Sequence, residues 1–298
     1  MYPVITKIGP FTLHTFGVML ALAILVGSHV LTREAHRLGD PAINDERLQK
    51  LIWYVVVAVV AGGRLMHVIV EWQYFSKHPL EIVAIWKGGL VMYGGLIAVF
   101  LTVVGFALRN KINVLRLCDL LAPSCFLGDA IGRWGCFFAG DDYGRPTSSW
   151  VGVRFTDPEC LVPPHLRGVP LHPTQIYMSI KAATIAAILF WLTRRKKFDG
   201  QVAGWAFILY AVFRSFIEFF RGDEDRGAVF HIDFNLFGYP VSWGSTAQFT
   251  SIFIFATGLL ILMLAPRKTL ADELAAAEAA SEAAEPKAAK KKRRRNRP

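Results

Sequence analysis

Long apolar runs separated by clustered charges dominate the chain. Residues 8–32, 88–108 and 234–266 contain no Asp, Glu, Lys or Arg. Each run is long enough to cross the hydrocarbon core of a bilayer as a helix, which takes about 20 residues. Further apolar stretches between these runs contain single charged residues. We therefore predict seven membrane-spanning helices, over residues 12–32, 48–71, 88–108, 115–138, 173–193, 200–221 and 242–265.

Basic residues flank these predicted helices on one side. They follow the first, third, fifth and seventh helices, as Arg33 and Arg37, Arg109 and Lys111, residues 194–197, and Arg267 and Lys268. The positive-inside rule makes that side cytoplasmic. The N-terminus is then expected outside and the C-terminus inside. The segments expected outside are residues 1–11, 72–87, 139–172 and 222–241.

The composition agrees with a membrane protein. Hydrophobic residues make up 53% of the 298 residues, and the mean hydropathy is +0.37, which is high for a soluble domain. The fold class that this predicts is an all-α polytopic membrane protein, with a transmembrane domain over residues 1–266. The longest external segment, residues 139–172, is rich in Pro, Gly and charge. It is too long for a simple turn and is expected to form a small periplasmic cap between the fourth and fifth helices.

The C-terminal tail, residues 267–298, has a different character. It is rich in Ala and Glu, ends in a basic run, and contains ten Lys and Arg residues against five Asp and Glu residues. We interpret it as a solvated cytoplasmic tail that also fixes the orientation, because such a composition cannot build a core. The alternative is an electrostatic contact with anionic lipid or RNA.

The four cysteines, Cys118, Cys125, Cys136 and Cys160, do not have the spacing of a zinc site. The first two lie in an apolar run and are interpreted as packing residues. Cys136 and Cys160 both lie near the external face, so a disulfide between them is one alternative and two free thiols are the other.

Polar residues inside the predicted helices gather at one depth. Ionisable groups are costly in a bilayer and usually face an interior cavity. With the orientation above, those of the outer leaflet are His14, Arg64, His67, Glu71, Tyr93, Arg133, His172, Gln175, Tyr177, Tyr210, Arg214 and Glu218. Asp119 and Lys181 are exceptions, since both lie deeper.

Three arginines at this depth predict an anion site. Arg64, Arg133 and Arg214 come from three different helices. Arginine binds phosphate through a bidentate fork and keeps its charge when buried, and a lipid phosphate is the anion found at this depth. Tyr210, Arg214 and Glu218 are spaced by four and share one helix face. The alternative is that each Arg–Glu pair only ties helices together.

The motif "GRWGCFFAGDDYGRP" (132–146) resembles the signature of the bacterial prolipoprotein diacylglyceryl transferase family. Further motifs follow the order of that family over nearly the whole chain up to about residue 265. They are "IGPFTLHTFG" (8–17), "GGRL" (62–65), "MYGGLIA" (92–98), "CDLLAP" (118–123), "HPTQIY" (172–177) and "YAVFRSFIEFFR" (210–221).

The resemblance implies an enzyme of the bacterial inner membrane with its active site at the outer leaflet. Such an enzyme transfers diacylglycerol from phosphatidylglycerol to the lipobox cysteine of a prolipoprotein signal peptide, leaving a thioether and glycerol 1-phosphate. It implies membrane lipids and signal peptides as partners. Neither a metal nor a cofactor is expected, and no specific nucleic acid partner is expected.

The resemblance also implies roles for individual residues. Arg133 and Arg214 would hold the lipid phosphate and stabilise the leaving group, and Glu218 would orient Arg214. Tyr93 stands where the family usually has a histidine that serves as a base. The remaining substrate-binding residues implied are Arg64, Tyr210, Gly144, Cys136, His172 and Gln175.

The sequence departs from the family at Tyr93 for histidine, Cys136 for asparagine, Phe16 for tyrosine and Met178 for glutamate. The substrate thiol needs a base or a positive field, because it is only slightly ionised near neutral pH. Tyr93, His67, His172 or the field of the arginines are the alternatives. The departures raise a second hypothesis, a silent relative that binds lipid or lipoprotein. A transporter is disfavoured, because the charges gather at one face and the sequence has no clear internal repeat.

Overall fold

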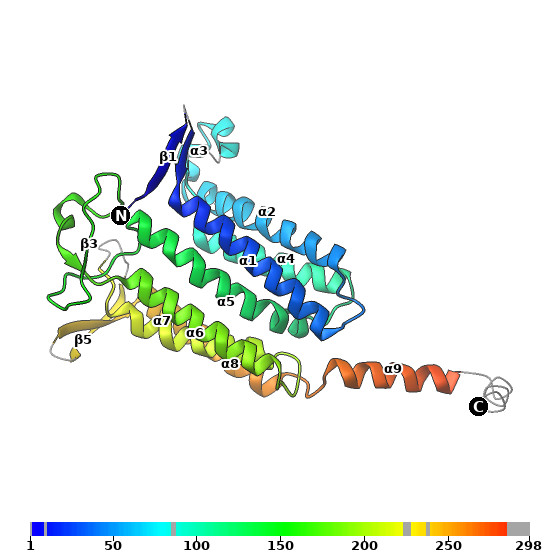
Figure 1. Ribbon diagram of the computed structural model, residues 1–298. Coiled ribbons are helices and arrows are strands. Elements are labelled where there is room, and N and C mark those ends of the chain that lie inside the picture. The colour runs from blue at the N-terminus through cyan, green and yellow to red at the C-terminus, as the bar shows by residue number, and fades with distance from the viewer. Residues whose placement is uncertain (1, 9–10, 85–87, 223–227, 237–238, 285–298) are drawn as a thin grey trace.

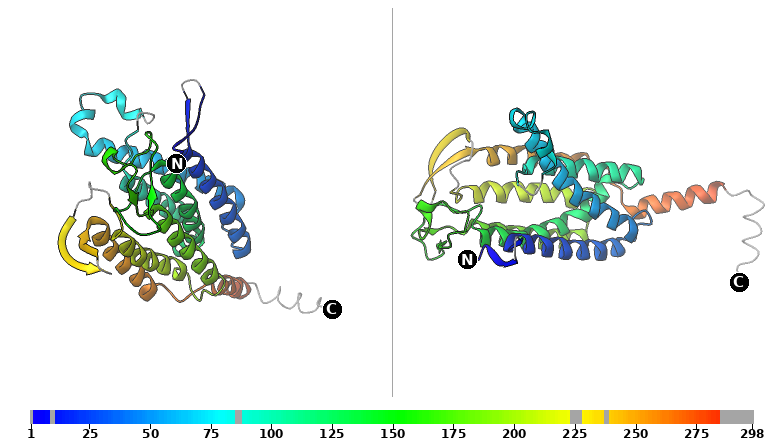
Figure 2. Two further views of the ribbon diagram at one scale, coloured as in Figure 1. Left: turned by 60° about the vertical axis from the view of Figure 1, so that its left-hand side comes forward. Right: turned by 90° about the horizontal axis from the view of Figure 1, so that it is seen from above.

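The computed structural model describes residues 2–8, 11–84, 88–222, 228–236 and 239–284. Its long helices lie side by side in one bundle (Figure 1), and two further views show the same arrangement (Figure 2). They are α1 (Thr15–Leu38), α2 (Asp45–Val70), α4 (Met92–Arg109), α5 (Val114–Ala139), α6 (Thr174–Thr193), α7 (Gln201–Glu218) and α8 (Thr246–Leu264).

These helices lie where the apolar runs predict them, with ends that differ by up to six residues. By length and composition, α1, α2, α4, α6 and α8 are apolar enough to cross a membrane. This agrees with a polytopic membrane protein. α5 and α7 fall outside that criterion. α5 packs against α1, α4, α6 and α7, and α7 packs against α6 and α8. Helices that are covered by protein on several sides can carry charged residues at less cost.

The prediction of an all-helical chain is incomplete, because the structure also contains three antiparallel strand pairs. They are β1 (Val4–Ile8) with β2 (Phe11–His14), β3 (Val153–Arg154) with β4 (Pro170–Leu171), and β5 (Ala228–Leu236) with β6 (Tyr239–Ser245). They gather at one end of the bundle (Figure 1), together with the short helix α3 (Trp72–Phe75). A 3-10 turn, η1 (Pro79–Val83), follows α3.

Residues 139–172, which we call the head segment, lie at this same end and have a small core of their own. The core consists of Tyr143, Phe155, Cys160, Val162 and Leu171. Phe137, from the last turn of α5, packs against it. The four cysteines of the chain are free, so the disulfide between Cys136 and Cys160 is not formed. Apolar packing therefore holds the head segment on α5 without a disulfide.

The opposite end of the bundle contains a buried ionic network around Arg116, the third residue of α5. Its guanidinium donates to Asp40 at 2.9 Å, to Asp199 at 2.8 Å and to Glu273 at 2.5 Å. Arg116, Asp40 and Asp199 are all less than 7% exposed. Glu273 belongs to the tail helix α9 (Leu270–Ala284), which extends away from the bundle (Figure 1). The basic end of the tail, residues 285–298, lies outside the described residues.

Asp119 completes this network one turn further along α5. Its carboxylate accepts the backbone N–H groups of Gly200, which precedes α7, and of Ala203, in the first turn of α7. Lys196 donates to the same carboxylate at 3.1 Å. Asp119, which the sequence analysis sets apart from the other polar residues, therefore caps α7 and joins it to α5.

Candidate active site

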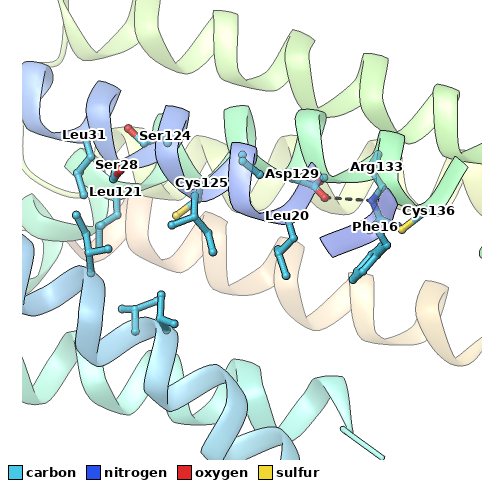
Figure 3. A pocket seen from close by; sticks show the side chains of 18 of the residues that line it. Phe16, Leu20, Ser28, Leu31, Leu121, Ser124, Cys125, Asp129, Arg133 and Cys136 are labelled. Carbon is cyan, nitrogen blue, oxygen red and sulfur yellow. Dashed lines mark hydrogen bonds and ion pairs between the residues drawn. The ribbon is translucent and has the colours of Figure 1, made fainter. Parts of the chain in front are cut away.

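A cavity of about 550 Å³ lies between α1, α2 and α5. Most of its wall is apolar, with side chains such as Leu20 and Ile24 from α1, Ile52 and Val55 from α2, and Leu121 from α5. Charged residues line only one end. Figure 3 shows this arrangement along α5, with Leu121 and Cys125 in the apolar part and Asp129, Arg133 and Cys136 at the charged end.

Arg133 is the cation at the charged end. Its Nε donates to Asp129 Oδ1 at 3.1 Å, and its Nη1 donates to Asp142 Oδ2 at 2.7 Å. The Arg133 side chain is still 23% exposed, so part of the guanidinium faces the cavity. Cys136, which is three residues later on the same helix, also lines the cavity. The structure therefore brings these two predicted site residues together.

Asp142 is held in place by an arginine of α5 and by an arginine that follows α7. Its carboxylate accepts from Arg133 and from Arg221, which follows α7. Its φ angle is +58°, in the left-handed region that aspartate tolerates better than most residues. The Thr174 hydroxyl donates to the carbonyl oxygen of Asp142, and Gln175 Nε2 donates to that of Asp141 at 2.6 Å. Gln175 thus supports the charged end through the backbone of the head segment.

Sequence reasoning missed Asp129, Asp142 and Arg221 as site residues. The sequence contained part of the information that points to these residues. Asp129 precedes Arg133 by four residues, and Asp142 is the second acid of "GDDYGR". Arg221 was read only as the end of a motif. Its pairing with Asp142 joins residues that are 79 positions apart, and no local pattern contains that information.

The donor atoms of Cys136, Asp141 and Asp142 lie within 4.8 Å of one another, which is the spacing that a metal ion would need. Both carboxylate oxygens of Asp142, however, accept from guanidinium groups. The negative charge of Asp142 is thus already matched by arginine, and the arrangement is that of an arginine–carboxylate cluster.

Gly144 lies where the head segment crosses between His172 and the end of α7. Its N–H donates to the carbonyl oxygen of His172 at 3.0 Å, and it pairs with Arg221 in an isolated bridge. His172 Nδ1 contacts the Tyr177 hydroxyl at 3.0 Å, and burial lowers the pKa of the His172 imidazole. His172 does not line the cavity. Gly144 and His172 therefore shape the head segment rather than the cavity wall.

Replacing Gly144 with alanine is expected to reduce activity at least about 10-fold and to lower stability by a few kcal/mol, as overpacking does. The added Cβ would lie 2.4 Å from the His172 carbonyl oxygen and 2.8 Å from that of Phe220, both backbone atoms. Activity and thermal unfolding of the purified variant would be measured. Gly168→Ala is a poor control because its φ is +77°, whereas Gly105→Ala, on the exposed side of α4, has open space around the added Cβ and does not line the cavity. Equal activity of Gly144→Ala and wild type would contradict the steric argument.

Tyr210, Arg214 and Glu218 lie behind the cavity wall, on α7. Arg214 Nη1 donates to Glu218, and the Arg214 side chain is 15% exposed. Lys181 of α6 connects this group to the cavity, because its Nζ lies 4.7 Å from the centre of the Tyr210 ring and 3.7 Å from Asp129 Oδ2. The three residues of α7 therefore border the site through Lys181, and none of them is among the described residues that line the cavity.

Arg64 and Tyr93 are not brought to the charged end. Arg64 donates to the backbone carbonyl oxygens of Glu81, Ile82, Gly88 and Gly89 and packs against Phe75. The prediction that three arginines meet around one anion is therefore corrected, because Arg64 holds the loop between η1 and α4 and, of the three, only Arg133 lines the cavity. Tyr93 is 52% exposed and does not line the cavity, although its neighbour Met92 does.

Comparisons with known proteins all indicate the same family. A sequence model of the prolipoprotein diacylglyceryl transferases matches residues 3–264. A phosphatidylglycerol–prolipoprotein diacylglyceryl transferase 2 of Clostridium perfringens is 32% identical over 258 residues, which cover 87% of this chain and 93% of the relative. The transferase of Bordetella avium is 31% identical over 273 residues, which cover 90% and 96%. That of Geobacillus kaustophilus is 34% identical over 222 residues, which cover 74% and 81%.

Proposed function

The chain belongs to the prolipoprotein diacylglyceryl transferase family, and we propose that the cavity between α1, α2 and α5 is where it performs the transfer. The enzyme moves the diacylglyceryl group of phosphatidylglycerol to the lipobox cysteine of a prolipoprotein. The observation that carries this assignment is the shape of the cavity, which is apolar along its length and has Arg133 at one end. This division matches a phospholipid with two acyl chains and one phosphate.

In this proposal the acyl chains lie along Leu20, Ile52 and Leu121, and the phosphate lies against Arg133. The leaving glycerol phosphate gains negative charge as its bond to the diacylglyceryl carbon breaks. A guanidinium that is already oriented by Asp129 and Asp142 stabilises that charge without reorganising. Arg214, which Glu218 orients, adds positive potential from α7, behind the cavity wall. The Tyr210 ring of the same helix contacts Lys181.

The head segment is the proposed site for the signal peptide. Asp141 and Asp142 line the charged end of the cavity, and Gln175 fixes their backbone. A cysteine presented there would meet the lipid beside its phosphate. We further propose that all seven long helices cross the inner membrane, with the head segment on the periplasmic side and α9 in the cytoplasm. The basic clusters after alternate helices support this orientation.

The test is a reaction with defined components. The purified protein is given phosphatidylglycerol and a lipobox peptide, and the mass of the peptide is followed. We expect a diacylglyceryl adduct with the cysteine peptide and none with a peptide in which serine replaces that cysteine. If no adduct forms over a range of detergents and lipids, the activity is refuted. The remaining hypothesis is then a silent relative that binds lipid or lipoprotein. Binding of labelled phosphatidylglycerol would then measure what the cavity still does.

A further inference from the structure

The residues that the sequence nominates as the base do not reach the cavity. Tyr93 is half-exposed beside it. The His67 ring packs edge-to-face on Phe75, with ring centres 5.5 Å apart, and lies beside Gly89. His172 is engaged with Tyr177 in the head segment. None of the three is among the described residues that line the cavity, so the proton of the substrate thiol needs another acceptor.

Three carboxylates line the cavity among the described residues: Asp129, Asp141 and Asp142. Asp142 accepts from two arginines, one on each oxygen. Asp141 is exposed in the head segment and accepts the backbone N–H of Asp142. Asp129 differs from both. It accepts from Arg133 on Oδ1, whereas its Oδ2 has only Lys181 nearby, at 3.7 Å, and its side chain is 31% exposed towards the cavity.

The position of Asp129 along α5 matches the reacting carbon. Asp129 lies between the apolar part of the cavity, at Leu121 and Cys125, and Arg133 (Figure 3). Four residues of α-helix rise by about 6 Å. In a phospholipid, the carbon that the thiol attacks lies between the phosphate and the ester-linked chains. With the phosphate on Arg133 and the chains in the apolar part, this carbon is at the level of Asp129.

We propose that Asp129 is the base that removes the proton of the substrate cysteine. This inference depends on the proposed function of the cavity. The Asp129 carboxylate takes the S–H proton while the sulfur forms a bond to the diacylglyceryl carbon. The bond between that carbon and the phosphate oxygen breaks, and its electron pair stays on the phosphate. The proton then passes from Asp129 to the departing glycerol phosphate, which restores the carboxylate.

Lys181 is a positioning residue in this scheme. It is 3% exposed on α6 and lies between Asp129 and the ring of Tyr210. The Arg133 guanidinium of α5 and the Lys181 ammonium of α6 thus face the two oxygens of Asp129 and hold its carboxylate at the cavity. The facing residues of α1, such as Leu20 and Ile24, are apolar.

The experiment compares two acceptor peptides with Asp129→Asn. One carries cysteine in the lipobox and the other carries selenocysteine, whose selenol is far more acidic and is already ionised near neutral pH. With the cysteine peptide we expect the variant to lose about 100-fold or more in rate, as for loss of a general base. With the selenocysteine peptide we expect most of the rate to return, because no proton has to be removed. Asp129→Glu should retain a measurable part of the cysteine rate.

Other outcomes overturn the proposal. If Asp129 only orients Arg133, Asp129→Asn will lose the same factor with both peptides. If Tyr93→Phe shows the selective loss with cysteine and Asp129→Asn does not, Tyr93 is the base. The Lys181→Met variant reads out the positioning role, since its rate should fall with the cysteine peptide and be largely kept with the selenocysteine peptide. Wild-type protein that modifies neither peptide would instead refute the proposed function itself.

Discussion

Replacing Arg133 with alanine is expected to lower kcat/KM for transfer from phosphatidylglycerol by about 100- to 1,000-fold, the range measured when one preorganised oxyanion donor is lost. The guanidinium is the only cation among the described residues that line the cavity, and two carboxylates hold it there. The fold should survive the change. Asp142 keeps Arg221 as a partner and Asp129 keeps Lys181, so neither carboxylate is left without a cation.

Arg133→Lys separates charge from geometry. An ammonium keeps the positive charge but cannot reproduce the planar fork that matches a phosphate, so an intermediate loss is expected. Arg195→Ala is the matched control, because it removes a charge that stacks on Trp191, at the opposite end of the bundle. Initial rates at several lipid concentrations would be measured on protein that elutes as a single species. Arg133→Ala with activity within about three-fold of wild type would refute the phosphate site.

The second large effect concerns stability rather than chemistry. Arg116→Met leaves the carboxylates of Asp40 and Asp199 buried without their guanidinium. Removing one partner of a buried ionic network costs about 3–5 kcal/mol. For a chain of this size the midpoint of thermal unfolding should fall on the order of 10 °C. Tryptophan fluorescence of the detergent-solubilised protein during heating measures it.

Two comparisons define this effect. Arg37→Met breaks a pair with Glu34 in which the arginine is 41% exposed, and such pairs contribute about 0–1 kcal/mol. Its unfolding midpoint should stay near that of wild type. The rate per folded molecule of Arg116→Met should also stay near that of wild type, since the network lies at the end of the bundle away from the head segment. An unchanged midpoint for Arg116→Met would show that the network does not stabilise the fold.

The positions of the long helices follow from the sequence, because a long run of apolar residues predicts a helix at those same residues. The face of a single helix follows too, as the four-residue step from Arg214 to Glu218 shows. Contacts between helices are different. The sequence groups Arg64 with Arg133 by depth alone, yet in the structure the Arg64 donors go to backbone carbonyl oxygens. Backbone acceptors are the same in every sequence, so side-chain patterns do not show them.

The same limit explains why the sequence did not indicate Asp129, the base that we propose. Asp129 and Arg133 share a helix, and their spacing was available in the sequence. The contact of Asp129 with Lys181 depends on how α5 and α6 are rotated and shifted against each other, which no single segment specifies. Tyr93 was one of several alternatives for the base because of its place in a motif, and its exposure became visible only in the structure. The two-residue strands β3 and β4 are too short to give a pattern. Residues 230–236 of β5 alternate between apolar and polar, so this strand signal was present in the sequence and was missed.

The shape of the cavity also separates the two products. α1 packs along α5 and α2 packs along α4, while few residues of α1 touch α2, so the apolar part of the cavity borders a loosely closed seam. If the transfer takes place in this cavity as we propose, the thioether-linked chains, which are insoluble in water, would depart sideways into lipid. Glycerol phosphate, which is insoluble in lipid, would depart past Asp141 and Asp142 into water. On this proposal each product has its own exit, and neither has to cross the path of the other.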